Sequence, residues 1–376
     1  MKLAVPRETT NGETRVAATP ESVKKLKSLG LDIVIETGAG NAARFADADY
    51  VAAGASIAPD ARTALEGADI VLKVRGPMGP ETALLKKGAV VAALLAPHSE
   101  KESIQGLASQ GVTAFAMELL PRISRAQAMD VLSSQANLAG YKAVIDAAAQ
   151  FGRAMPMMMT AAGTIAPARV LVMGVGVAGL QAIATAKRLG AIVSATDVRP
   201  ATKEQVESLG GTFVAVMDEE FKNAQTAGGY AKEMSPEYQT RQAALIAETI
   251  RKQDIIITTA LIPGRKAPVL VSEDMIKTMK PGSVIVDLAA EAGGNTPLTK
   301  ANAVIEIHGV TIMGYTNLPG RLAVDSSSLY SRNLFNFISL IVDKKTGALA
   351  VDWNDEIIKG AALTRDGDVI HPVAKG

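Results

Sequence analysis

Three glycines and one aspartate have the spacing of a site that binds a dinucleotide. Gly174, Gly176 and Gly179 follow the pattern G-x-G-x-x-G, and Asp197 comes eighteen residues after the last glycine. In this pattern the first glycine permits a tight turn, the second lets backbone amides approach a pyrophosphate, and the third lets a helix pack closely on a strand. The spacing therefore predicts phosphate binding at the glycines and ribose binding at Asp197.

The segments around these residues supply the elements that such a site needs. A strand is expected at 170–173, a helix at 177–189 that ends before Gly190, and a second strand at 191–196. A glycine-rich turn of purely structural use is one alternative, but the strand, helix and acid in this order favour nucleotide binding. A membrane span is another, because residues 170–186 contain no charged residue. The glycines and nearby prolines argue against a span, and a buried parallel strand that leads into a packed helix has the same hydropathy.

The composition excludes several classes of function. The chain of 376 residues has 39 basic and 38 acidic side chains, a net charge of +1 and no basic stripe, so nucleic acid is not expected as a partner. The absence of cysteine rules out disulfides and thiol catalysis and suits a reducing cytosol. His98, His308 and His371 lack the spacing of a metal site, so no metal is expected. The N-terminus has no apolar segment typical of a secretory signal.

Length and pattern predict two domains of the α/β class. In the N-terminal region of the chain, strands are expected at 2–5, 32–36, 69–74, 89–95 and 112–116. Further along, the six strands of a doubly wound dinucleotide fold are expected at 170–173, 191–196, 212–216, 254–259, 283–287 and 310–314.

Two long helices are expected to connect the domains, at about 133–151 and 325–341. The nucleotide domain would then comprise residues 133–321, and the N-terminal domain would be discontinuous, with residues 1–132 and 322–376. The prediction is two Rossmann-like, doubly wound domains joined by long connector helices, with the cleft for the dinucleotide, NAD, between them.

Two segments exceed what a minimal dinucleotide fold needs. Residues 217–253 include the sequence Ala227-Gly228-Gly229-Tyr230, which suits either a mobile flap or a solvent-exposed insertion. Met155–Pro167 has four methionines and a turn at Gly163. It predicts an apolar hairpin that makes a subunit contact or packs in the core, rather than a cofactor site.

Polar side chains crowd the entry to the first connector helix. They are Arg122, Ser124, Gln127, Asp130, Ser133 and Gln135. These side chains would lie near the carboxyl ends of both sheets, which is where a bound nicotinamide is expected. A proton donor is harder to identify. His98 fits a surface loop at least as well as a catalytic site, and Lys73 could serve a substrate or be a solvated charge at a strand end.

Six motifs spread over essentially the entire chain resemble a known family. They are PRISRAQAMDVLSSQANLAGY, MMMTAAGTIAPARVLVMGVGVAGLQAIATAKRLGA, ATDVRPATKEQVESLGG, AGGYAKEM, TTALIPG and PGSVIVDLAAEAGGN. They are very similar to the NAD(H)-binding component, domain I, of proton-translocating NAD(P) transhydrogenases. The wider family includes alanine dehydrogenase, to which ETRVAATPESV and VLKVRGP are also similar. The length of the chain resembles the split type, in which the alpha subunit is divided and this component, its first portion, is a separate polypeptide.

The resemblance implies roles for residues in three places. On a loop that orients the dihydronicotinamide it implies catalytic roles for Arg122, Gln127, Asp130 and Ser133, with Ile123 and Ser124 also binding the cofactor. It places Val175, Gly176 and Val177 at the pyrophosphate, and the flanking Gly174 and Gly179 also belong to the cofactor site. At the adenosine ribose it implies Asp197, Val198 and Arg199, and the pocket is completed by Gly229, Tyr230, Gln242 and Leu261. Asp197 would repel a 2′-phosphate and select NAD over NADP, whereas Arg199 could pair with that phosphate.

The resemblance also implies partners. NAD(H) would bind to this chain and NADP(H) to a partner subunit, while an integral membrane subunit would move protons. No stretch of the sequence qualifies as a transmembrane helix, so those functions would belong to other polypeptides. The component would be a homodimer in the cytoplasm, attached peripherally to the cytoplasmic face of the inner membrane.

A free-standing NAD-dependent alanine dehydrogenase is the main alternative, and a non-catalytic NAD-binding regulator is a third. Arg15 and Lys73 occupy the motifs with which alanine dehydrogenases bind a 2-oxo acid. The catalytic histidine of those enzymes comes three residues before the proline of the L-A-P turn, where this chain has Leu94. Leucine cannot donate or accept a proton. Direct hydride transfer between two nicotinamides does not need such a group, so a transhydrogenase tolerates the loss of the histidine. Arg15 and Lys73 would then be inherited structural residues.

Overall fold

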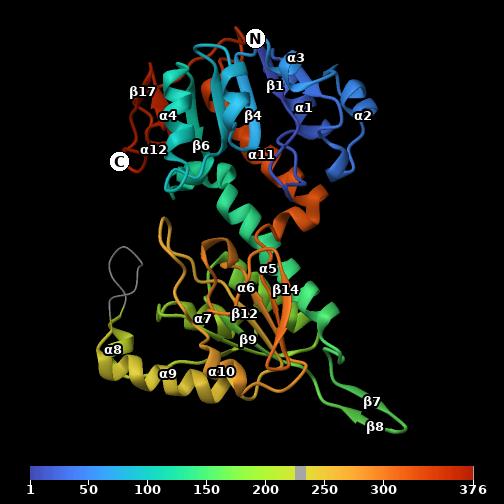
Figure 1. Cartoon of the computed structure of the whole chain (residues 1–376), viewed down its shortest axis with the longest axis vertical. Coiled ribbons are helices and arrows are strands. Elements are labelled where there is room, and N and C mark those ends of the chain that lie inside the picture. The colour runs from blue at the N-terminus through green and yellow to red at the C-terminus, as the bar shows by residue number, and fades with distance from the viewer. Residues whose placement is uncertain (225–233, 376) are drawn as a thin grey trace. The chain divides into compact units, whose positions relative to one another are not determined.

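The computed structural model describes residues 1–224 and 234–375 of the chain (Figure 1). The chain forms two compact units. Unit 1 contains Met1–Gln135 and Pro319–Gly376, and unit 2 contains Ala136–Leu318. Each unit is built on a mostly parallel sheet whose strands alternate with helices along the chain. The predicted α/β class with two Rossmann-like units is therefore confirmed.

In the described residues, the sheet of unit 1 has six parallel strands in the order β3-β2-β1-β4-β5-β6. They are β1 (Lys2–Val5), β2 (Asp32–Glu36), β3 (Ser56–Ala58), β4 (Ile70–Arg75), β5 (Val90–Leu94) and β6 (Thr113–Ala116). Almost every residue of β4 and β5 is buried, as expected for parallel strands whose two faces are both covered. The five predicted strands are confirmed. The edge strand β3 was missed because its three residues are too few to give a periodic signal.

The first helix of unit 1 begins at a local capping signal. In α1 (Pro20–Lys27), Thr19 Oγ1 accepts a hydrogen bond from the Ser22 amide at 3.3 Å, and Ser22 Oγ accepts one from the Thr19 amide at 2.9 Å. This reciprocal pair is a capping box. The other helices are α2 (Asp47–Ala52), α3 (Ala61–Leu65), α4 (Lys101–Ser109), α11 (Ala323–Ile341) and α12 (Glu356–Ala361).

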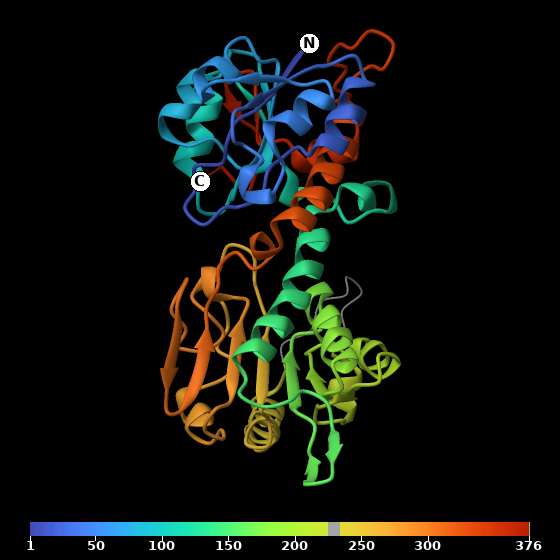
Figure 2. The ribbon, with the colours of Figure 1, turned by 90° about the vertical axis from the view of Figure 1, so that its right-hand side faces the viewer.

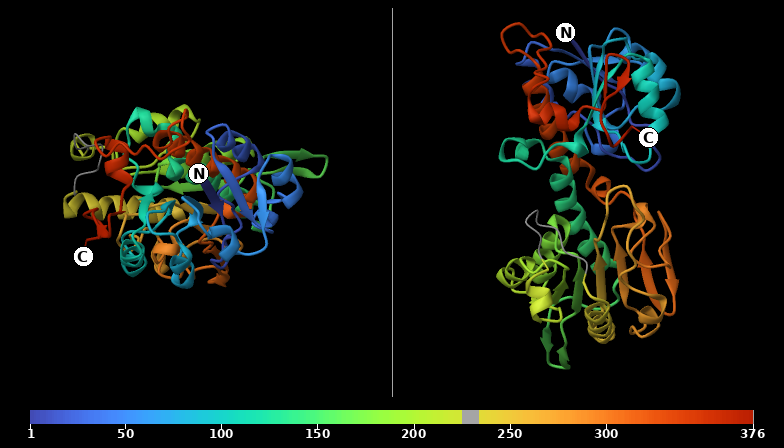
Figure 3. Two further views of the ribbon diagram at one scale, coloured as in Figure 1. Left: turned by 90° about the horizontal axis from the view of Figure 1, so that it is seen from above. Right: turned by 90° about the vertical axis from the view of Figure 1, so that its left-hand side faces the viewer.

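The C-terminal region of the chain packs into unit 1. Helix α11 buries Tyr330, Leu334 and Phe337 in the core that also contains residues of β1, β2 and β4. Figure 3 shows this orange-red helix beside the sheet. After α12, Thr364 Oγ1 accepts a hydrogen bond from the Ala114 amide at 2.9 Å, which ties the hairpin β16 (Thr364–Arg365) and β17 (Asp368–Val369) to β6.

The sheet of unit 2, as far as the structure describes it, has seven strands in the order β11-β10-β9-β12-β13-β15-β14. They are β9 (Arg169–Met173), β10 (Ile192–Thr196), β11 (Thr212–Phe213), β12 (Ile255–Thr258), β13 (Val284–Asp287), β14 (Val304–Ile307) and β15 (Val310–Met313). The strand order reverses between β9 and β12, which is where doubly wound sheets bind ligands.

The prediction of six strands in unit 2 was one strand short. β14 pairs antiparallel with β15, and the two-residue turn at His308 and Gly309 has positive φ angles of 55° and 72°. Such a turn closes a tight hairpin. Only the second arm of this hairpin was predicted, because the first arm is a short, half-exposed edge strand whose apolar run is interrupted by Glu306.

Helix α5 (Val131–Gln150) begins in unit 1 and continues in unit 2, where it is a close neighbour of α6 (Val177–Arg188). A Cβ atom at Gly140 of α5 would lie only 2.1 Å from the carbonyl oxygen of Ala178, so glycine permits this contact. Ala143 and Ala147 continue the buried face of α5. The remaining helices that the structure describes in unit 2 are α7 (Thr202–Ser208), α8 (Glu219–Lys222), α9 (Pro236–Ile250) and α10 (Glu273–Lys277).

The methionine-rich segment before β9 forms the predicted hairpin, from β7 (Met158–Thr160) and β8 (Gly163–Ile165). It projects from unit 2 (Figure 2), and the side chain of Met159 is 79% exposed. Of its two expected roles, core packing holds only for Met155, which is buried in the core of unit 2, whereas Met157, Met158 and Met159 are exposed. The uncharged run 170–186 is a strand followed by most of a helix, which overturns the alternative of a span. In residues 1–224 and 234–375, no helix has the length and apolar character that crossing a bilayer requires.

Candidate dinucleotide site

The turn after β9 has a backbone that only glycine adopts readily. Gly174 has a φ of 101°, and its amide donates a hydrogen bond to the carbonyl of Thr196 at 2.9 Å. A Cβ atom at this position would lie 2.4 Å from Thr259 Oγ1. A side chain at position 174 is therefore excluded both by conformation and by space.

The other two glycines of the pattern differ in what surrounds them. Gly176 caps the N-terminus of α6 without a side-chain hydrogen bond, is exposed, and would meet no atom within 4 Å if it carried a Cβ. A Cβ at Gly179 would instead lie 1.9 Å from the carbonyl oxygen of Gly174. Gly179 thus lets the helix pack on the turn, and Gly176 leaves open space beside helix amides that have no intrahelical partner. Amides in this arrangement favour an anion.

Asp197 follows β10 and is held by its neighbours in the chain. Its Oδ2 accepts hydrogen bonds from the Val175 amide at 2.7 Å and from Arg199 Nη2 at 2.8 Å. Its Oδ1 accepts two more from the Arg199 amide and Nε, at 2.9 and 2.8 Å. Burial is the largest influence and opposes ionisation, but the hydrogen bonds from Arg199 and Val175 outweigh it and lower the pKa of Asp197. The carboxylate is therefore charged and adjoins the glycine turn.

Further expected pocket residues surround the same edge of the sheet of unit 2. Gln242 of α9 accepts a hydrogen bond from the Val216 amide at 2.8 Å and donates one to Thr196 Oγ1 at 3.4 Å, directly before Asp197. Val177, Val198 and Leu261 have exposed side chains. Gly229 and Tyr230 lie outside the described residues, so the expected flap remains a prediction.

The expected nicotinamide loop belongs to unit 1. Its core is a 3-10 turn at Ser124–Met129, on which the side chains of Ser124 and Gln127 are exposed, as is that of Arg122 just before it. Ile123 is partly buried and packs against the unit 1 core. After the turn, Asp130 accepts two hydrogen bonds from Ser133. The Ser133 amide donates to Oδ1 at 2.9 Å, and Ser133 Oγ donates to Oδ2 at 2.5 Å.

The expected site residues thus form two groups. One group gathers around the glycine turn in unit 2, and the other gathers before α5 in unit 1. Within each group the structure brings together residues that the sequence analysis assigned to the same region of the ligand. Among the described residues, no cluster of acidic or histidine side chains has the arrangement of a metal site.

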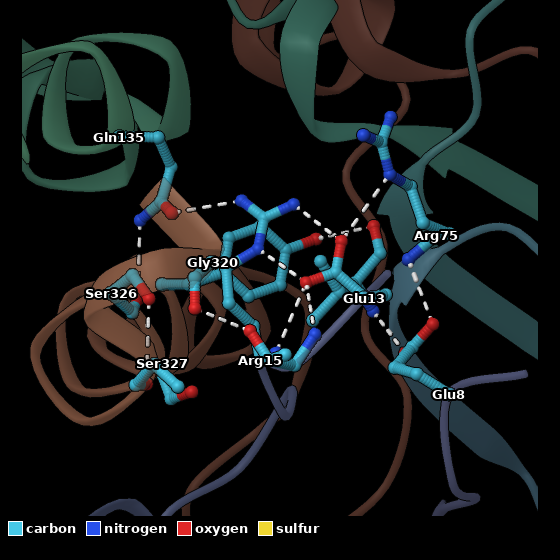
Figure 4. Close-up of polar contacts among 12 residues, drawn as sticks. Glu8, Glu13, Arg15, Arg75, Gln135, Gly320, Ser326 and Ser327 are labelled. Carbon is cyan, nitrogen blue, oxygen red and sulfur yellow. Dashed lines mark hydrogen bonds and ion pairs between the residues drawn. The ribbon is translucent and has the colours of Figure 1, made fainter. Parts of the chain in front are cut away.

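Arg15 and Lys73, which occupy the motifs of a 2-oxo acid site, are buried and form ion pairs. Figure 4 shows the ion pair of Arg15. Arg15 donates to Glu13 through Nε and Nη2, both at 2.7 Å, and to Gln135 Oε1 through Nη1 at 2.9 Å. Lys73 donates to Glu81 at 2.8 Å, and its side chain is 1% exposed. The alternative that Lys73 is a solvated strand-end charge is therefore wrong. Both cations already have carboxylate partners inside unit 1.

Glu8 lies in the same buried cluster. It accepts hydrogen bonds from the amides of Val74 and Arg75 at 2.7 and 3.2 Å, and its carboxylate lies 3.9 Å from Lys73 Nζ. Burial raises the pKa of Glu8 to about 7, although Lys73 and the two amides act in the opposite direction. Leu94 ends β5 and packs against the unit 1 core, and His98 is exposed in the turn that follows.

Sequence reasoning assigned no role to Thr259, Asp287 and Asn295, which connect the loops beside the glycine turn. Thr259 Oγ1 donates to the carbonyl of Gly174 at 3.0 Å, and Asn295 hydrogen-bonds to Ala260. A usable signal was present for two of them, because Thr259 follows an apolar strand and Asp287 ends one, at the edge where ligands bind.

Comparison with known proteins identifies the family. Residues 4–139 match the model of the alanine dehydrogenase/PNT N-terminal domain, and residues 143–372 match that of the C-terminal domain. A relative from Rhodospirillum rubrum, the first portion of NAD(P) transhydrogenase subunit alpha, is 56% identical, with 100% of this chain and 99% of that protein covered. A crystal structure of transhydrogenase from Sinorhizobium meliloti, 54% identical, superposes with a TM-score of 0.90 over 98% of this chain and 100% of that one.

The more distant relatives are similar over most of their length. Alanine dehydrogenase of Halomonas elongata is 32% identical over 92% of this chain and 88% of that protein. The resemblance to the transhydrogenase alpha subunit, stated from six motifs, is thus confirmed over the whole chain. Because both domain models match it and a relative aligns with it over nearly the full length of both proteins, the chain belongs to the alanine dehydrogenase/PNT family.

Proposed function

We propose that this chain is the NAD(H)-binding component of a proton-translocating NAD(P) transhydrogenase. Bound NADH supplies a hydride, which passes directly to NADP⁺ held by a partner subunit. The glycine turn of unit 2 is the observation that carries the proposal, because Gly176 leaves open space beside the first amides of α6. The similarity to the alpha-subunit polypeptide of Rhodospirillum rubrum over both full lengths supports the transhydrogenase assignment.

Residues of unit 2 would bind the adenosine and pyrophosphate groups of the cofactor. The proposed set is Gly174, Val175, Gly176, Val177, Gly179, Asp197, Val198 and Arg199, and the pocket of the cofactor would be completed by Gly229, Tyr230, Gln242 and Leu261. The Val175 amide donates to Asp197, so its contribution is to fix the turn against the ribose acid. The pyrophosphate would then be bound by the amides that follow Gly176.

Residues of unit 1 would orient the dihydronicotinamide. Arg122, Ser124 and Gln127 have exposed side chains that are available to a ligand, with Ile123 between them. The hydrogen-bonded pair of Asp130 and Ser133 would fix the end of this loop at the start of α5. These residues supply orientation rather than proton transfer, because a hydride moves between two carbon atoms and no oxygen or nitrogen changes its protonation.

The partners follow from this assignment. An NADP(H)-binding subunit and an integral membrane subunit would complete the enzyme, with this chain on the cytoplasmic face of the inner membrane. The name of the Rhodospirillum rubrum relative, which is one portion of a divided subunit, supports the need for further chains. The exposed methionine hairpin supports a homodimer, because apolar side chains exposed together often mark a subunit contact.

Reconstitution tests the proposal. The purified chain is titrated with NADH by ligand fluorescence and is then mixed with a separately prepared NADP(H)-binding subunit for single-turnover transfer between the two bound nucleotides. Saturable NADH binding and transfer that requires both proteins are expected. No NADH binding, or NADH oxidation that does not need the second subunit, would overturn it.

An alanine dehydrogenase is the second candidate, and the 32% identity with that enzyme of Halomonas elongata favours it. Arg15 and Lys73 are present, but Leu94 stands where the resemblance implies a catalytic histidine. Amino-acid oxidation requires a group that accepts a proton from the substrate amine. The transhydrogenase function therefore accounts for the residues of this chain better.

A further inference from the structure

A chain of hydrogen bonds links the loops that follow β9, β12 and β13 in unit 2. It begins at Asp287, which ends β13 and has no exposed surface. Its Oδ1 accepts from Thr258 Oγ1 at 3.1 Å and the Ala289 amide at 2.9 Å, and its Oδ2 accepts from the Asn295 amide at 2.7 Å and Thr299 Oγ1 at 2.5 Å. Both carboxylate oxygens are thus used to fix the loop that carries Asn295.

The buried side chain of Asn295 holds the loop after β12. Its Oδ1 accepts a hydrogen bond from the Ala260 amide at 3.1 Å, and its Nδ2 donates to the carbonyls of Ala260 and Pro268 at 2.9 and 2.8 Å. Asn295 therefore satisfies both backbone polar groups of Ala260, as a neighbouring strand would. No other side chain of this size offers an acceptor and two donors in a neutral group.

The same loop is fixed to the glycine turn on its other side. The Thr259 amide donates to the carbonyl of Met173 at 2.9 Å, and Thr259 Oγ1 donates to the carbonyl of Gly174 at 3.0 Å. Asn295 and Thr259 thus hold two consecutive residues of one loop. Directly after them the chain exposes two apolar side chains, Leu261 at 55% and Ile262 at 46%.

The sheet order indicates which half of a dinucleotide this loop would meet. Asp197 follows β10, on one side of β9, and β12 lies on the other side. A dinucleotide crosses the point where the strand order reverses, with its adenosine ribose at the acid and its pyrophosphate at the glycine turn. The loop after β12 is therefore on the side of the nicotinamide half.

We infer that Asn295 is a positioning residue, which holds the loop Thr259–Ile262 so that Leu261 and Ile262 form a fixed apolar surface for the nicotinamide half of NADH. This inference rests on the proposed function. A fixed surface restricts the ring before transfer, and a displacement of about 1 Å costs on the order of 100-fold in rate. Loss of the Asn295 side chain should therefore affect the nicotinamide half and leave binding of the adenosine half intact.

The test compares Asn295→Ala and Asn295→Asp with wild type in the full-length chain. Alanine removes all three side-chain hydrogen bonds, and aspartate keeps the shape but replaces the two donors with an acceptor. The matched control is Asn302→Asp, because exposed Asn302 uses only its Oδ1, which accepts from the amide and hydroxyl of Thr316 at 3.3 and 2.6 Å. Affinities for NADH and for ADP-ribose, which lacks the nicotinamide, are measured beside single-turnover transfer to the NADP(H)-binding subunit.

The expected result is a split between the two ligands. Both Asn295 variants should bind ADP-ribose within about twofold of wild type, lose the additional affinity that NADH has over ADP-ribose, and transfer hydride roughly 10- to 100-fold more slowly. Asn302→Asp should match wild type in all three measurements. An unchanged transfer rate in the alanine variant, or equal loss of affinity for both ligands, would overturn the inference.

A further variant keeps the test decisive if the Asn295 variants do not fold. Leu261→Ala changes an exposed side chain and should reproduce the slower transfer with unchanged ADP-ribose binding, and wild-type behaviour of this variant would also overturn the inference. Failure of the proposed function is distinguishable, because wild type itself would then bind no NADH or transfer no hydride.

Discussion

Arg199 holds the carboxylate of Asp197 with two side-chain hydrogen bonds of 2.8 Å each, and its amide adds a third of 2.9 Å. The two charges at the end of β10 therefore compensate each other before any ligand binds. Arg199 Nη2 also donates to the carbonyl of Val175 at 3.2 Å, which joins this pair to the glycine turn. The sequence left open whether Asp197 or Arg199 determines the selectivity for NADH over NADPH. Because the two side chains are paired, substitution of Asp197 tests which of them does so.

Wild type should bind NADH with a clear preference over NADPH, because the guanidinium is committed to Asp197 and the carboxylate repels a 2′-phosphate. Asp197→Asn removes the repelling charge and releases Arg199 for that phosphate. The ratio of NADH to NADPH affinity should then fall by at least about tenfold, which corresponds to about 1.4 kcal/mol.

Fluorescence titration with both nucleotides measures this ratio. The double variant Asp197→Asn with Arg199→Gln is the control, since it lacks the cation and should gain no NADPH affinity. Equal or tighter binding of NADPH by wild type would mean that Arg199, rather than Asp197, determines selectivity.

The chain should not oxidise alanine. With alanine and NAD⁺, or with pyruvate, ammonia and NADH, turnover should not exceed background, because Leu94 offers no proton acceptor and Arg15 and Lys73 have carboxylate partners. Absorbance of NADH at high enzyme concentration detects the reaction. NADH formation that depends on alanine would contradict the transhydrogenase assignment and require another group, such as His98, to act as the proton acceptor.

Gln127→Asn should slow hydride transfer on the order of 100-fold with little change in NADH affinity. The substitution keeps the amide but withdraws it by one methylene, whereas most of the affinity should come from the glycine turn and Asp197. Gln105→Asn on α4, also exposed in unit 1, is the matched control. If transfer is unaffected, or slows only because NADH no longer binds, Gln127 does not orient the ring.

Glu8→Gln should change how the stability of unit 1 depends on pH. Wild-type Glu8 retains its proton up to about pH 7 in the folded state, whereas the unfolded chain loses that proton near 4.5. The folded state binds more protons within this window, so the free energy of unfolding falls as pH rises through it. Glutamine does not titrate, so the Glu8→Gln variant should not lose free energy of unfolding for this reason as pH rises.

Chemical denaturation at about pH 5 and about pH 8 tests this prediction. Relative to wild type, the Glu8→Gln variant should gain stability between the two pH values by on the order of 2 kcal/mol. The exposed Glu102→Gln on α4 controls for the change in net charge. Parallel pH profiles for wild type and Glu8→Gln would show that Glu8 ionises normally in the folded protein.

Local sequence signals predicted most strands and the glycine turn. Gly174 has the positive φ and Gly179 the close packing that the pattern requires, since both properties depend on neighbours in the sequence. The edge strands β3 and β14 were missed because segments of three or four residues pair through backbone contacts and are too short to show a clear apolar period.

Contacts between distant residues were beyond prediction from a single sequence. The side chain of Asn295 satisfies the backbone of Ala260 because β12 and β13 are neighbours, and no local pattern encodes that neighbourhood. A solvated Lys73 was a reasonable alternative for the same reason, since its partner Glu81 follows in a separate turn. Roles that the family resemblance implies for Gly229 and Tyr230 lie outside the described residues and stay predictions.

The methionine hairpin β7–β8 should stabilise the proposed homodimer. Met157 and Met159 are 61% and 79% exposed, so their replacement by serine should not weaken the fold of the monomer. Burial of a methionine at an interface contributes about 1.5–3 kcal/mol, and the double variant should raise the dimer dissociation constant by at least about tenfold.

Sedimentation equilibrium measures this constant, and thermal unfolding checks the fold. Met78→Ser, at a methionine that is 51% exposed in unit 1, is the matched control and should leave the dimer unchanged. A double variant that associates as tightly as wild type would show that the hairpin does not contribute to the subunit contact.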